Sequence, residues 1–341
     1  MRIVIFKFNH LGDNVVFLPA VQALRRLQPD WHLTLLTTPN ESELYRGPFA
    51  PQEILTSPKL AFDKSHRRPW VLARWIWQVR RRRPDACLVS FDQGSAAHLV
   101  AKLSGAPVRI GGNLENIRVW DSLTTVIPQP ADGRPVTWHW DMTRELLRVL
   151  GSGAMLPATP SLPDLEHLGA RPAKAAGRQR ILVHAGASRP INQWPVEKFA
   201  TVARDLARDH DVAWIEHGGT TGPAPSGTTA ARPLSLGDLA SHLRGADLFL
   251  GNNSGPMHLA NALGVRGVAV TGPSALGWNP FWFQEHWTVL RHPSLACAPC
   301  ERLSVALEGC VNLASPMACL AYWTAERVAA ACRAQLTGVA A

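Results

Sequence analysis

Four stretches of the chain repeat one order of segments: a short apolar run rich in β-forming residues, a polar or glycine turn, a segment of helical period and a second apolar run. They begin with "RIVIFKF" (2–8), "DACLVSF" (85–91), "RILVHAG" (180–186) and "ADLFLGN" (246–252). Units of about thirty residues that alternate strand and helix form parallel sheets with helices on both faces. The sequence therefore predicts an α/β protein.

The chain of 341 residues is long enough for two such sheets. Residues 157–180 are rich in Pro, Ala and basic residues and lack a sustained period, so we place a linker at 161–179. In open α/β sheets, ligands bind beyond the carboxyl ends of the strands, and the turns there could form two walls of one cleft. The predicted parts are an N-terminal domain at 1–160, a C-terminal domain at 180–322 with a cysteine-rich segment at 293–319, and a terminal helix at 323–341.

The net charge of +9 favours an anionic partner, such as nucleic acid, a membrane surface or a phosphorylated substrate. We exclude nucleic acid, because the sequence has no zinc-finger or helix-turn-helix pattern and no recognisable stacking motif. The N-terminus lacks a cleavage site, and no apolar run approaches about eighteen residues, so we expect neither a signal peptide nor a spanning helix. We therefore predict a cytoplasmic protein, and in that reducing compartment structural disulfides between its six cysteines are improbable.

The stretch "GNNSGPMHLANALG" follows the last of the four strands and reads as a polar turn and a helix start. Ser254 or Asn253 can cap this helix, and Pro256 suits its first turn. Gly255 lets a ligand approach the backbone closely, and the free N–H groups of the helix end can bind an anion. His258 could donate a hydrogen bond to a phosphate. From local chemistry alone, simple capping with His258 packed as a structural residue fits equally well.

A second turn of the same shape, "HAGASRPINQWP", follows the third strand. Gly186, Ala187 and Ser188 could surround an anion, and Arg189 could pair with it. Neither turn matches the P-loop or the dinucleotide-binding fingerprint, which argues against an ATPase and an oxidoreductase.

Asp13 follows the first strand directly, at the start of a helix. A carboxylate there is stabilised by the helix dipole and can cap the helix. If it faces a cleft, it could instead act as a general base towards a hydroxyl. Taken alone, the position favours the cap.

Three blocks together resemble glycosyltransferase family 9, the ADP-heptose:lipopolysaccharide heptosyltransferases. They are "GDNVVFLPAVQALRR", "HAGAS…QWPVEKFATVARDL" and "LSLGDLASHLRGADLFLGNNSGPMHLANALG" followed by "GP". The resemblance covers most of the chain in the same order and spacing. It implies a GT-B fold, with two Rossmann-like domains facing an interdomain cleft, the donor on the C-terminal domain and the acceptor on the N-terminal one.

The resemblance also implies an activity. It is the inverting, metal-independent transfer of a heptose from ADP-heptose to a hydroxyl of lipopolysaccharide core, a protein or a small metabolite, with no catalytic cofactor. Asp13 then matches the catalytic base, and the two turns hold the donor diphosphate. The implied donor-binding residues are Gly12, Gly186, Ala187, Ser188, Arg189, Asn192, Asn253, Ser254, Gly255, Pro256, Met257 and His258.

Two positions depart from the family pattern. Asn192 stands where the family commonly has a lysine that contacts donor phosphate, and Asn253 stands where it usually has aspartate. Loss of the cation should weaken diphosphate binding by about 1–3 kcal/mol, and Arg189 could supply the missing charge. Two alternatives stay open: a different nucleotide sugar, or a non-catalytic nucleotide-binding or scaffold protein. The retained Asp13 argues against the second.

Four cysteines lie within a short C-terminal segment, in the pattern C-x2-C-x9-C-x8-C. Four thiols can bind structural zinc or iron tetrahedrally, and reduced thiols or a disulfide are the alternatives. Autotransporter heptosyltransferases of the family are similar in carrying a cysteine-bound iron. The candidate metal ligands are Cys297, Cys300, Cys310 and Cys319.

The segment "RPWVLARWIWQVRRRRPD" (68–85) predicts a basic amphipathic helix. It could contact anionic lipid or a phosphorylated lipid acceptor, which would place the protein at the periphery of the inner membrane. We favour a helix packed on the first sheet with a solvated arginine face, since most charge runs are solvated. Its apolar face has Leu72, Trp75, Ile76 and Val79, and another face has Arg67, Arg74, Gln78 and Arg81.

Overall fold

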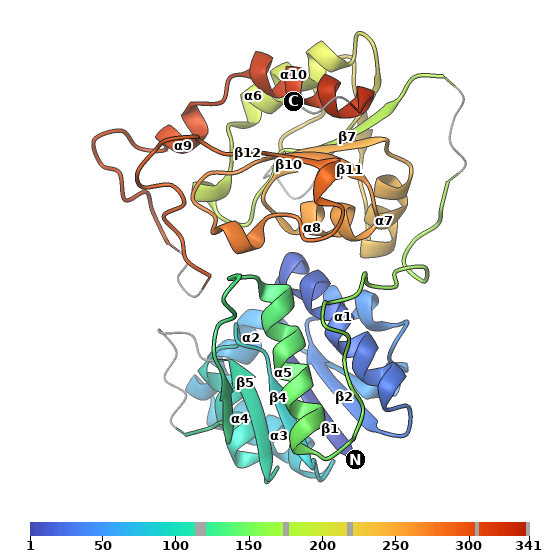
Figure 1. Cartoon of the computed structure of the whole chain (residues 1–341), viewed down its shortest axis with the longest axis vertical. Coiled ribbons are helices and arrows are strands. Elements are labelled where there is room, and N and C mark those ends of the chain that lie inside the picture. Colours follow the sequence, from blue (N-terminus) through green and yellow to red (C-terminus); the bar gives the residue numbers. More distant parts are fainter. Residues whose placement is uncertain (113–120, 173–176, 217–220, 304–306, 339–341) are drawn as a thin grey trace. The chain divides into compact units, whose positions relative to one another are not determined.

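The computed structural model describes residues 1–112, 121–172, 177–216, 221–303 and 307–338 (Figure 1). The chain divides into two compact units, Met1–His167 and Leu168–Ala341. This division lies inside the segment 161–179, of which 173–176 are outside the described residues. The predicted terminal helix corresponds to α10, Ala325–Thr337, and 339–341 are again outside the described residues.

The first unit contains a six-stranded parallel sheet in the order β3-β2-β1-β4-β5-β6. The strand order reverses between β1 and β4, which pair directly, so this sheet has a topological switch point there. The strands are β1 Arg2–Lys7, β2 His32–Thr37, β3 Ile54–Thr56, β4 Ala86–Val89, β5 Val108–Gly112 and β6 Thr125–Ile127.

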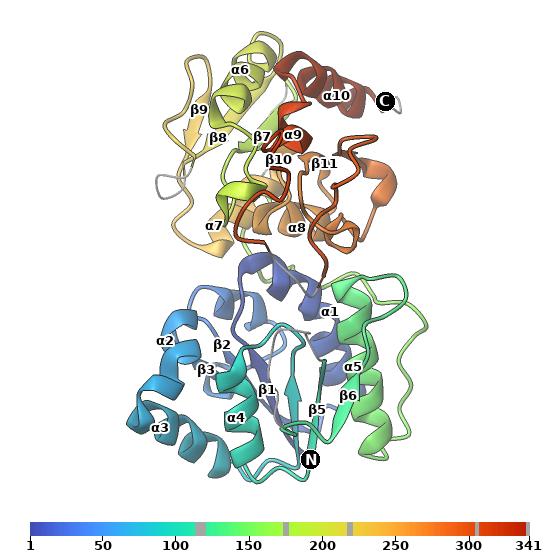
Figure 2. The same cartoon turned by 90° about the vertical axis from the view of Figure 1, so that its left-hand side faces the viewer.

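Helices cover both faces of this sheet (Figure 2). Because side chains alternate along a strand, Val4 and Phe6 of β1 join one apolar core, which also includes Trp75 and Val79. That face is covered by α2 Lys59–Asp63, α3 Pro69–Arg80 and α4 Ser95–Leu103, and the other by α1 Leu11–Leu27 and α5 Pro135–Val149. Short 3-10 turns are η1 Glu41–Tyr45, η2 Pro51–Glu53 and η3 Lys64–Arg67.

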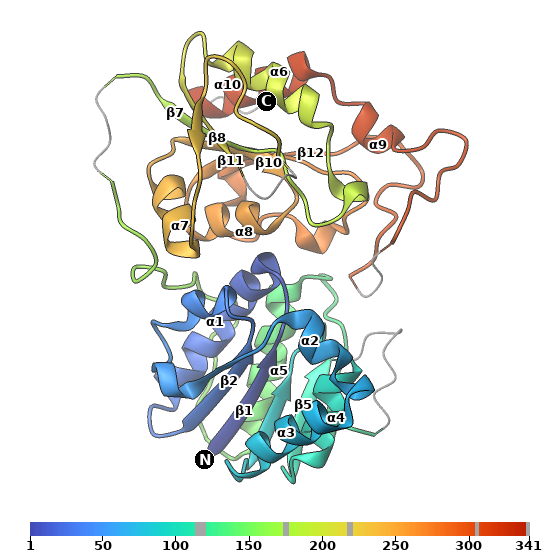
Figure 3. The same cartoon turned by 180° about the vertical axis from the view of Figure 1, so that it is seen from behind.

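The second unit repeats this architecture with the order β12-β11-β10-β7-β8-β9, again all parallel (Figure 3). Helices α6 Val196–Leu206 and α10 lie over one face, and α7 Leu236–Arg244 and α8 Gly255–Ala262 over the other. The strands are β7 Arg180–His184, β8 Asp211–Ile215, β9 Thr229–Ala231, β10 Leu248–Asn252, β11 Arg266–Val270 and β12 Trp287–Leu290. The remaining elements are α9 Ala318–Ala321, η4 Pro190–Asn192, η5 Leu276–Trp278 and η6 Gln284–His286.

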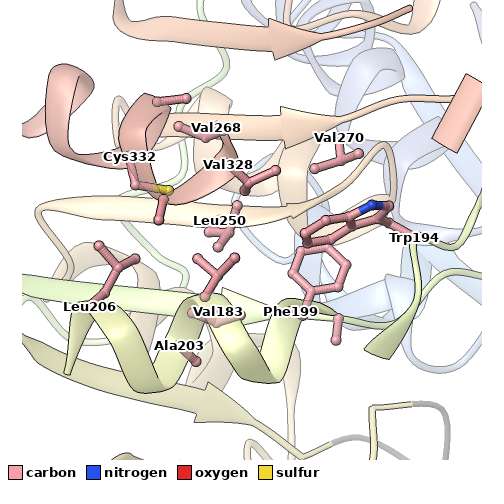
Figure 4. Packing of buried hydrophobic residues seen from close by; sticks show 14 of the residues in the cluster. Val183, Trp194, Phe199, Ala203, Leu206, Leu250, Val268, Val270, Val328 and Cys332 are labelled. Carbon is pink, nitrogen blue, oxygen red and sulfur yellow. The ribbon is translucent and has the colours of Figure 1, made fainter. Parts of the chain in front are cut away.

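The core of the second unit anchors one of the predicted donor turns (Figure 4). Trp194 is fully buried against Phe199 of α6, with ring centroids 4.7 Å apart in an edge-to-face arrangement. Its indole Nε1 donates to the carbonyl of Trp323 at 3.2 Å. The chain that follows the turn 186–192 is therefore fixed in the apolar core of the unit.

The two parallel sheets with helices on both faces confirm the predicted α/β class with two Rossmann-like domains. Throughout the described ranges, no helix combines the length and the apolar character needed to cross a bilayer.

Candidate functional site

Charged groups are buried at the carboxyl ends of β1 and β4. Lys7 is completely inaccessible, and its Nζ donates to Asp92 Oδ2 at 2.5 Å and to Ser90 Oγ at 3.1 Å. His139 Nε2 lies 2.8 Å from the same Ser90 oxygen. Burial alone would raise the pKa of Asp92, but the Lys7 ammonium and the hydrogen bonds lower it to about 2. Asp92 is thus a carboxylate paired with a buried ammonium.

Asp13 lies in the first turn of α1, beside this pair. It does not cap the helix: the N-cap residue is His10, and no described residue donates a hydrogen bond to the Asp13 carboxylate. Burial raises the pKa of Asp13, and the negative charge of Asp92 raises it further, whereas Lys7 and His10 oppose the shift. Gly12, its neighbour, is buried. Asp13 is therefore a half-buried carboxyl with raised proton affinity and unused acceptor atoms.

Glu41 is a third carboxyl of this site, and sequence reasoning missed it. It begins η1, which is joined to α1 by the hydrogen bond from Tyr45 OH to Asn14 Oδ1 at 2.7 Å. Thr38 Oγ1 donates to the Glu41 carboxyl. Burial raises the pKa of Glu41 to about 7, and the Asp13 charge contributes to the rise.

A signal for Glu41 and Asp92 was present in the sequence. Both follow strands that flank β1, in "TTPNESE" and "SFDQG". Polar residues after neighbouring parallel strands meet at the same edge of the sheet. The strand order, which sequence reasoning did not establish, was needed to see this.

Replacing Glu41 by glutamine should stabilise the protein at alkaline pH. The pKa of Glu41 is about 7 in the folded state and 4.5 ordinarily, so the folded protein holds this proton more tightly than the unfolded chain does. The stability that protonated Glu41 contributes is complete below pH 4.5 and is lost as the pH rises through 7. Glu41→Gln removes the charge that burial disfavours. We expect a gain of about 1–3 kcal/mol in unfolding free energy at pH 8 and almost none at pH 4, measured by urea denaturation. An equal gain at both pH values would contradict this origin.

In the second unit, β7 and β10 are neighbours, so the turns that follow them lie at one edge of the sheet. Asn252 joins these turns. It is fully buried, its Nδ2 donates to the carbonyls of Ala185 at 2.9 Å and Gly186 at 3.2 Å, and its Oδ1 accepts from Trp194 N at 2.9 Å. Sequence reasoning gave no role to Asn252, which holds the 185–186 backbone in place.

The start of α8 offers free polar groups. Ser254 is the N-cap, yet its hydroxyl makes no capping bond, and its buried Oγ has no partner within the described chain. Pro256 has no N–H, and the N–H of Met257 donates to Ser254 O at 3.1 Å. Gly255 N–H is left without a partner among the residues described. A helix end with these free donors fits an anion.

Asn253 and His258 lie on either side of this helix start. Asn253 Nδ2 donates to Trp278 O at 3.1 Å, and the His258 ring packs edge-to-face on the Trp278 ring at 5.7 Å. His258 is 5% exposed, and burial lowers its pKa to about 4. It is therefore a neutral packed imidazole near pH 7, able to donate one hydrogen bond but no positive charge.

Arg189 does not offer a free cation. Its guanidinium makes two bonds to the carboxylate of buried Glu301, with Nη2 to Oε2 at 3.0 Å, and a third bond from Nη1 to Leu307 O at 3.0 Å. The expectation that Arg189 replaces the missing lysine charge therefore needs correction, because Glu301 already neutralises it.

The remaining residues of this turn present neutral groups. Gly186 is buried, Ala187 is half-buried and Ser188 is exposed. Asn192 is buried, and its Oδ1 has no partner in the described part of the chain. Asn192 Oδ1 and Ser254 Oγ are thus two orphaned buried oxygens, carried by the turns after two neighbouring strands.

The four cysteines of the C-terminal segment line one small cavity, together with Ile191 and Pro273. All are free thiols, and residues 304–306 between them lie outside the described chain. Burial raises the pKa of Cys300 and of Cys319, and the neighbouring sulfurs raise both further. In the described ranges, no three His, Cys, Asp or Glu side chains are arranged to hold a metal ion. The four thiols therefore lie around one cavity, but the described residues do not place them in the arrangement of metal ligands.

Residues 73–309 match the model of glycosyltransferase family 9 (heptosyltransferase). The chain belongs to this family. A curated relative, lipooligosaccharide heptosyltransferase 2 of Campylobacter jejuni, is 26% identical over 145 residues. That match covers 39% of this chain and 45% of the relative, so the chain spans a little under half of the relative's length.

This family 9 chain is also similar in fold to proteins whose structures have been solved. The ADP-heptose lps heptosyltransferase II of E. coli has a TM-score of 0.67 at 17% identity, covering 99% of both chains. The iron-containing dodecameric glycosyltransferase TibC of enterotoxigenic E. coli has a TM-score of 0.59 at 15% identity, covering 98% of this chain and 75% of TibC. These structures show the same fold, and the match to the family model confirms the predicted family.

Proposed function

We propose that this protein transfers a heptose from ADP-heptose to a hydroxyl acceptor by an inverting, metal-independent displacement. The proposal rests chiefly on Asp13, a half-buried carboxyl of raised pKa that does not cap its helix and forms no ion pair with any of the described residues. Family membership and the free anion-binding groups at the start of α8 support the same activity. A scaffold protein would have no use for a base of this kind.

In this proposal, the oxygen of the acceptor hydroxyl attacks the anomeric carbon of the heptose, and Asp13 accepts the proton of that hydroxyl. A new carbon–oxygen bond forms on one face of the sugar. The bond to the diphosphate oxygen breaks on the other, and its electron pair leaves with ADP. Gly255 N–H and Ser254 Oγ stabilise the charge that develops on the diphosphate. His258 adds a neutral donor.

The donor turns would thus hold the diphosphate with dipoles and not with a lysine. Asn192 contributes a neutral amide, and Arg189 stays paired with Glu301. A different nucleotide sugar is the alternative within the same enzyme class. Titration of the purified protein with ADP, UDP and GDP tests the choice: ADP should bind more tightly, and Ser254→Ala should weaken it. Tighter binding of UDP or GDP would favour the alternative, and no binding of any nucleotide would argue for a scaffold.

The proposal specifies the acceptor only by its chemical class, a molecule with a free hydroxyl. A hydroxyl of lipopolysaccharide core, of a protein side chain or of a small metabolite would meet Asp13 on the N-terminal unit. We propose a cytoplasmic location for this reaction, because nucleotide sugars are consumed there.

We also propose that Cys297, Cys300, Cys310 and Cys319 hold a structural zinc or iron ion. Their gathering around one cavity supports this, because four thiolates suit either metal. Elemental analysis of protein purified without chelator should find about one metal ion per chain. Cys300→Ser should lose the metal and melt at a lower temperature.

Cys332 provides the matched control for the metal. It is buried in α10 and does not line the cavity, so Cys332→Ser should keep the metal. A metal-free wild-type protein with four reactive thiols, or with disulfides detected by intact mass, would contradict the proposal.

A further inference from the structure

The inner face of α3 is accounted for by packing. Trp75 and Val79 are buried in the core of the first unit, and the Trp75 ring lies edge-to-face on Phe62 at 5.4 Å. Leu72 and Ile76 pack partly against the same core. The predicted apolar face is therefore the one that binds the helix to its sheet, and no partner is needed to explain it.

The outer face of α3 has no such explanation. Trp70 is 71% exposed and Trp77 is 58% exposed. Arg74 and Arg81 are exposed as well, and the Arg81 guanidinium lies 4.7 Å from the Trp77 ring centroid. Positions 70, 74, 77 and 81 follow the spacing i, i+4, i+7 and i+11, which places them in one line along a helix. We call these four residues the Trp/Arg stripe.

The sequence around the stripe is strongly basic. From Lys64 to Pro84 it contains seven arginines and one lysine and no acidic residue. Arg67, Arg68 and Arg80 are exposed beside the stripe. Leu60 of α2, which precedes the stripe in the sequence, is an exposed apolar residue as well, with 63% of its surface accessible. Indole rings and guanidinium groups thus alternate along a helix with a uniform positive charge.

We propose that the Trp/Arg stripe binds the surface of an anionic phospholipid bilayer. Indole rings are amphipathic and favour the depth of lipid headgroups, while arginines pair with lipid phosphates and bury their stems beside the rings. A charge of one sign complements an anionic membrane. A protein partner would need an acidic groove, whereas a bilayer needs only an exposed line of such residues. This docking does not depend on the proposed transferase activity.

Co-sedimentation with vesicles tests the proposal. The full-length protein is mixed with vesicles of phosphatidylcholine alone or of phosphatidylcholine with phosphatidylglycerol, at low and at physiological salt. We expect at least about tenfold stronger binding to the anionic vesicles, with weaker binding at higher salt. Trp70→Ser/Trp77→Ser and Arg74→Gln/Arg81→Gln should each lower this binding about tenfold.

Leu234→Ser/Arg208→Gln serves as the control. It removes an even more exposed apolar residue and an exposed arginine from the second unit, and it should bind vesicles like the wild type. Circular dichroism and melting curves establish that each variant is folded. Binding of soluble ADP should be unchanged in the stripe variants, which separates this proposal from the proposed function.

Three results would overturn the proposal: no binding of the wild type to anionic vesicles, equal binding to neutral ones, or undiminished binding by both stripe variants. A measurement by sedimentation velocity could give a fourth result that overturns the proposal. If the wild type self-associates without binding vesicles, and Trp70→Ser/Trp77→Ser makes it monomeric, the stripe is an interface with a second copy.

Discussion

Replacing Asp13 by asparagine should lower the rate of sugar transfer about 100- to 10,000-fold, the range typical of a lost general base. Asparagine has nearly the same shape but cannot accept the proton of the attacking hydroxyl. Because Asp13 is proposed to act on the acceptor, the affinity for ADP should stay close to that of the wild type. Steady-state kinetics and ADP titration of the two proteins provide the measurement.

Asn14→Asp is not a useful control for this variant, because Asn14 bonds to Tyr45 and to the backbone of Asn9. Asp63→Asn is better suited, since Asp63 is a half-buried carboxylate that pairs with Lys59 on the same unit. It should retain most of the activity. An Asp13→Asn enzyme as fast as the wild type would remove Asp13 from the mechanism.

The dependence of kcat/KM on pH tests the role of Asp13 as the base independently. Burial and the Asp92 charge raise the pKa of Asp13 above the ordinary 3.8. Because the base must be ionised to accept a proton, kcat/KM should fall on the acid side at a pH above 3.8. In the Asp13→Asn variant, the residual rate should lack this limb.

Replacing Asp92 by alanine should cost about 3–5 kcal/mol of unfolding free energy, since it leaves the ammonium of Lys7 buried without a counter-charge. Lys7 is wholly inaccessible and is bonded to both Asp92 and Ser90, so the pair belongs to the framework of the switch point. Urea denaturation at pH 7 measures the loss.

The double variant Lys7→Met/Asp92→Leu distinguishes the lost charge balance from lost packing. Removing both charges should restore part of the stability lost in Asp92→Ala, because no unpaired ion remains. If the double variant is less stable than Asp92→Ala, the buried charge of Lys7 is not the main cause of the loss.

Much of the fold could be predicted because the relevant signals are local. "RIVIFKF" and "RILVHAG" alternate with helical segments at short range, and such units pack in few ways. Asp13 and Ser254 could be proposed as site residues for the same reason: each follows a strand at a helix start. The structure adds that neither side chain caps its helix.

The remaining features depend on pairs of residues far apart in the sequence. Arg189 meets Glu301, which lies 112 positions away, so its neutralisation was not visible in the turn. Asn252 was passed over because its partners belong to a turn 66 and 67 positions away. The helical period placed Trp75 on the apolar face of its helix but gave Trp70 and Trp77 no role, and their exposure became visible only in the structure.

The most direct test of the transferase proposal is the release of nucleoside diphosphate from a panel of nucleotide sugars, with lipopolysaccharide-core and peptide acceptors present. We predict that the wild-type protein releases ADP from ADP-heptose faster than it releases the diphosphate from any other sugar nucleotide, and that Asp13→Asn slows this release at least about 100-fold. Release from none of the donors, or release from ADP-heptose that does not depend on Asp13, would contradict the proposal.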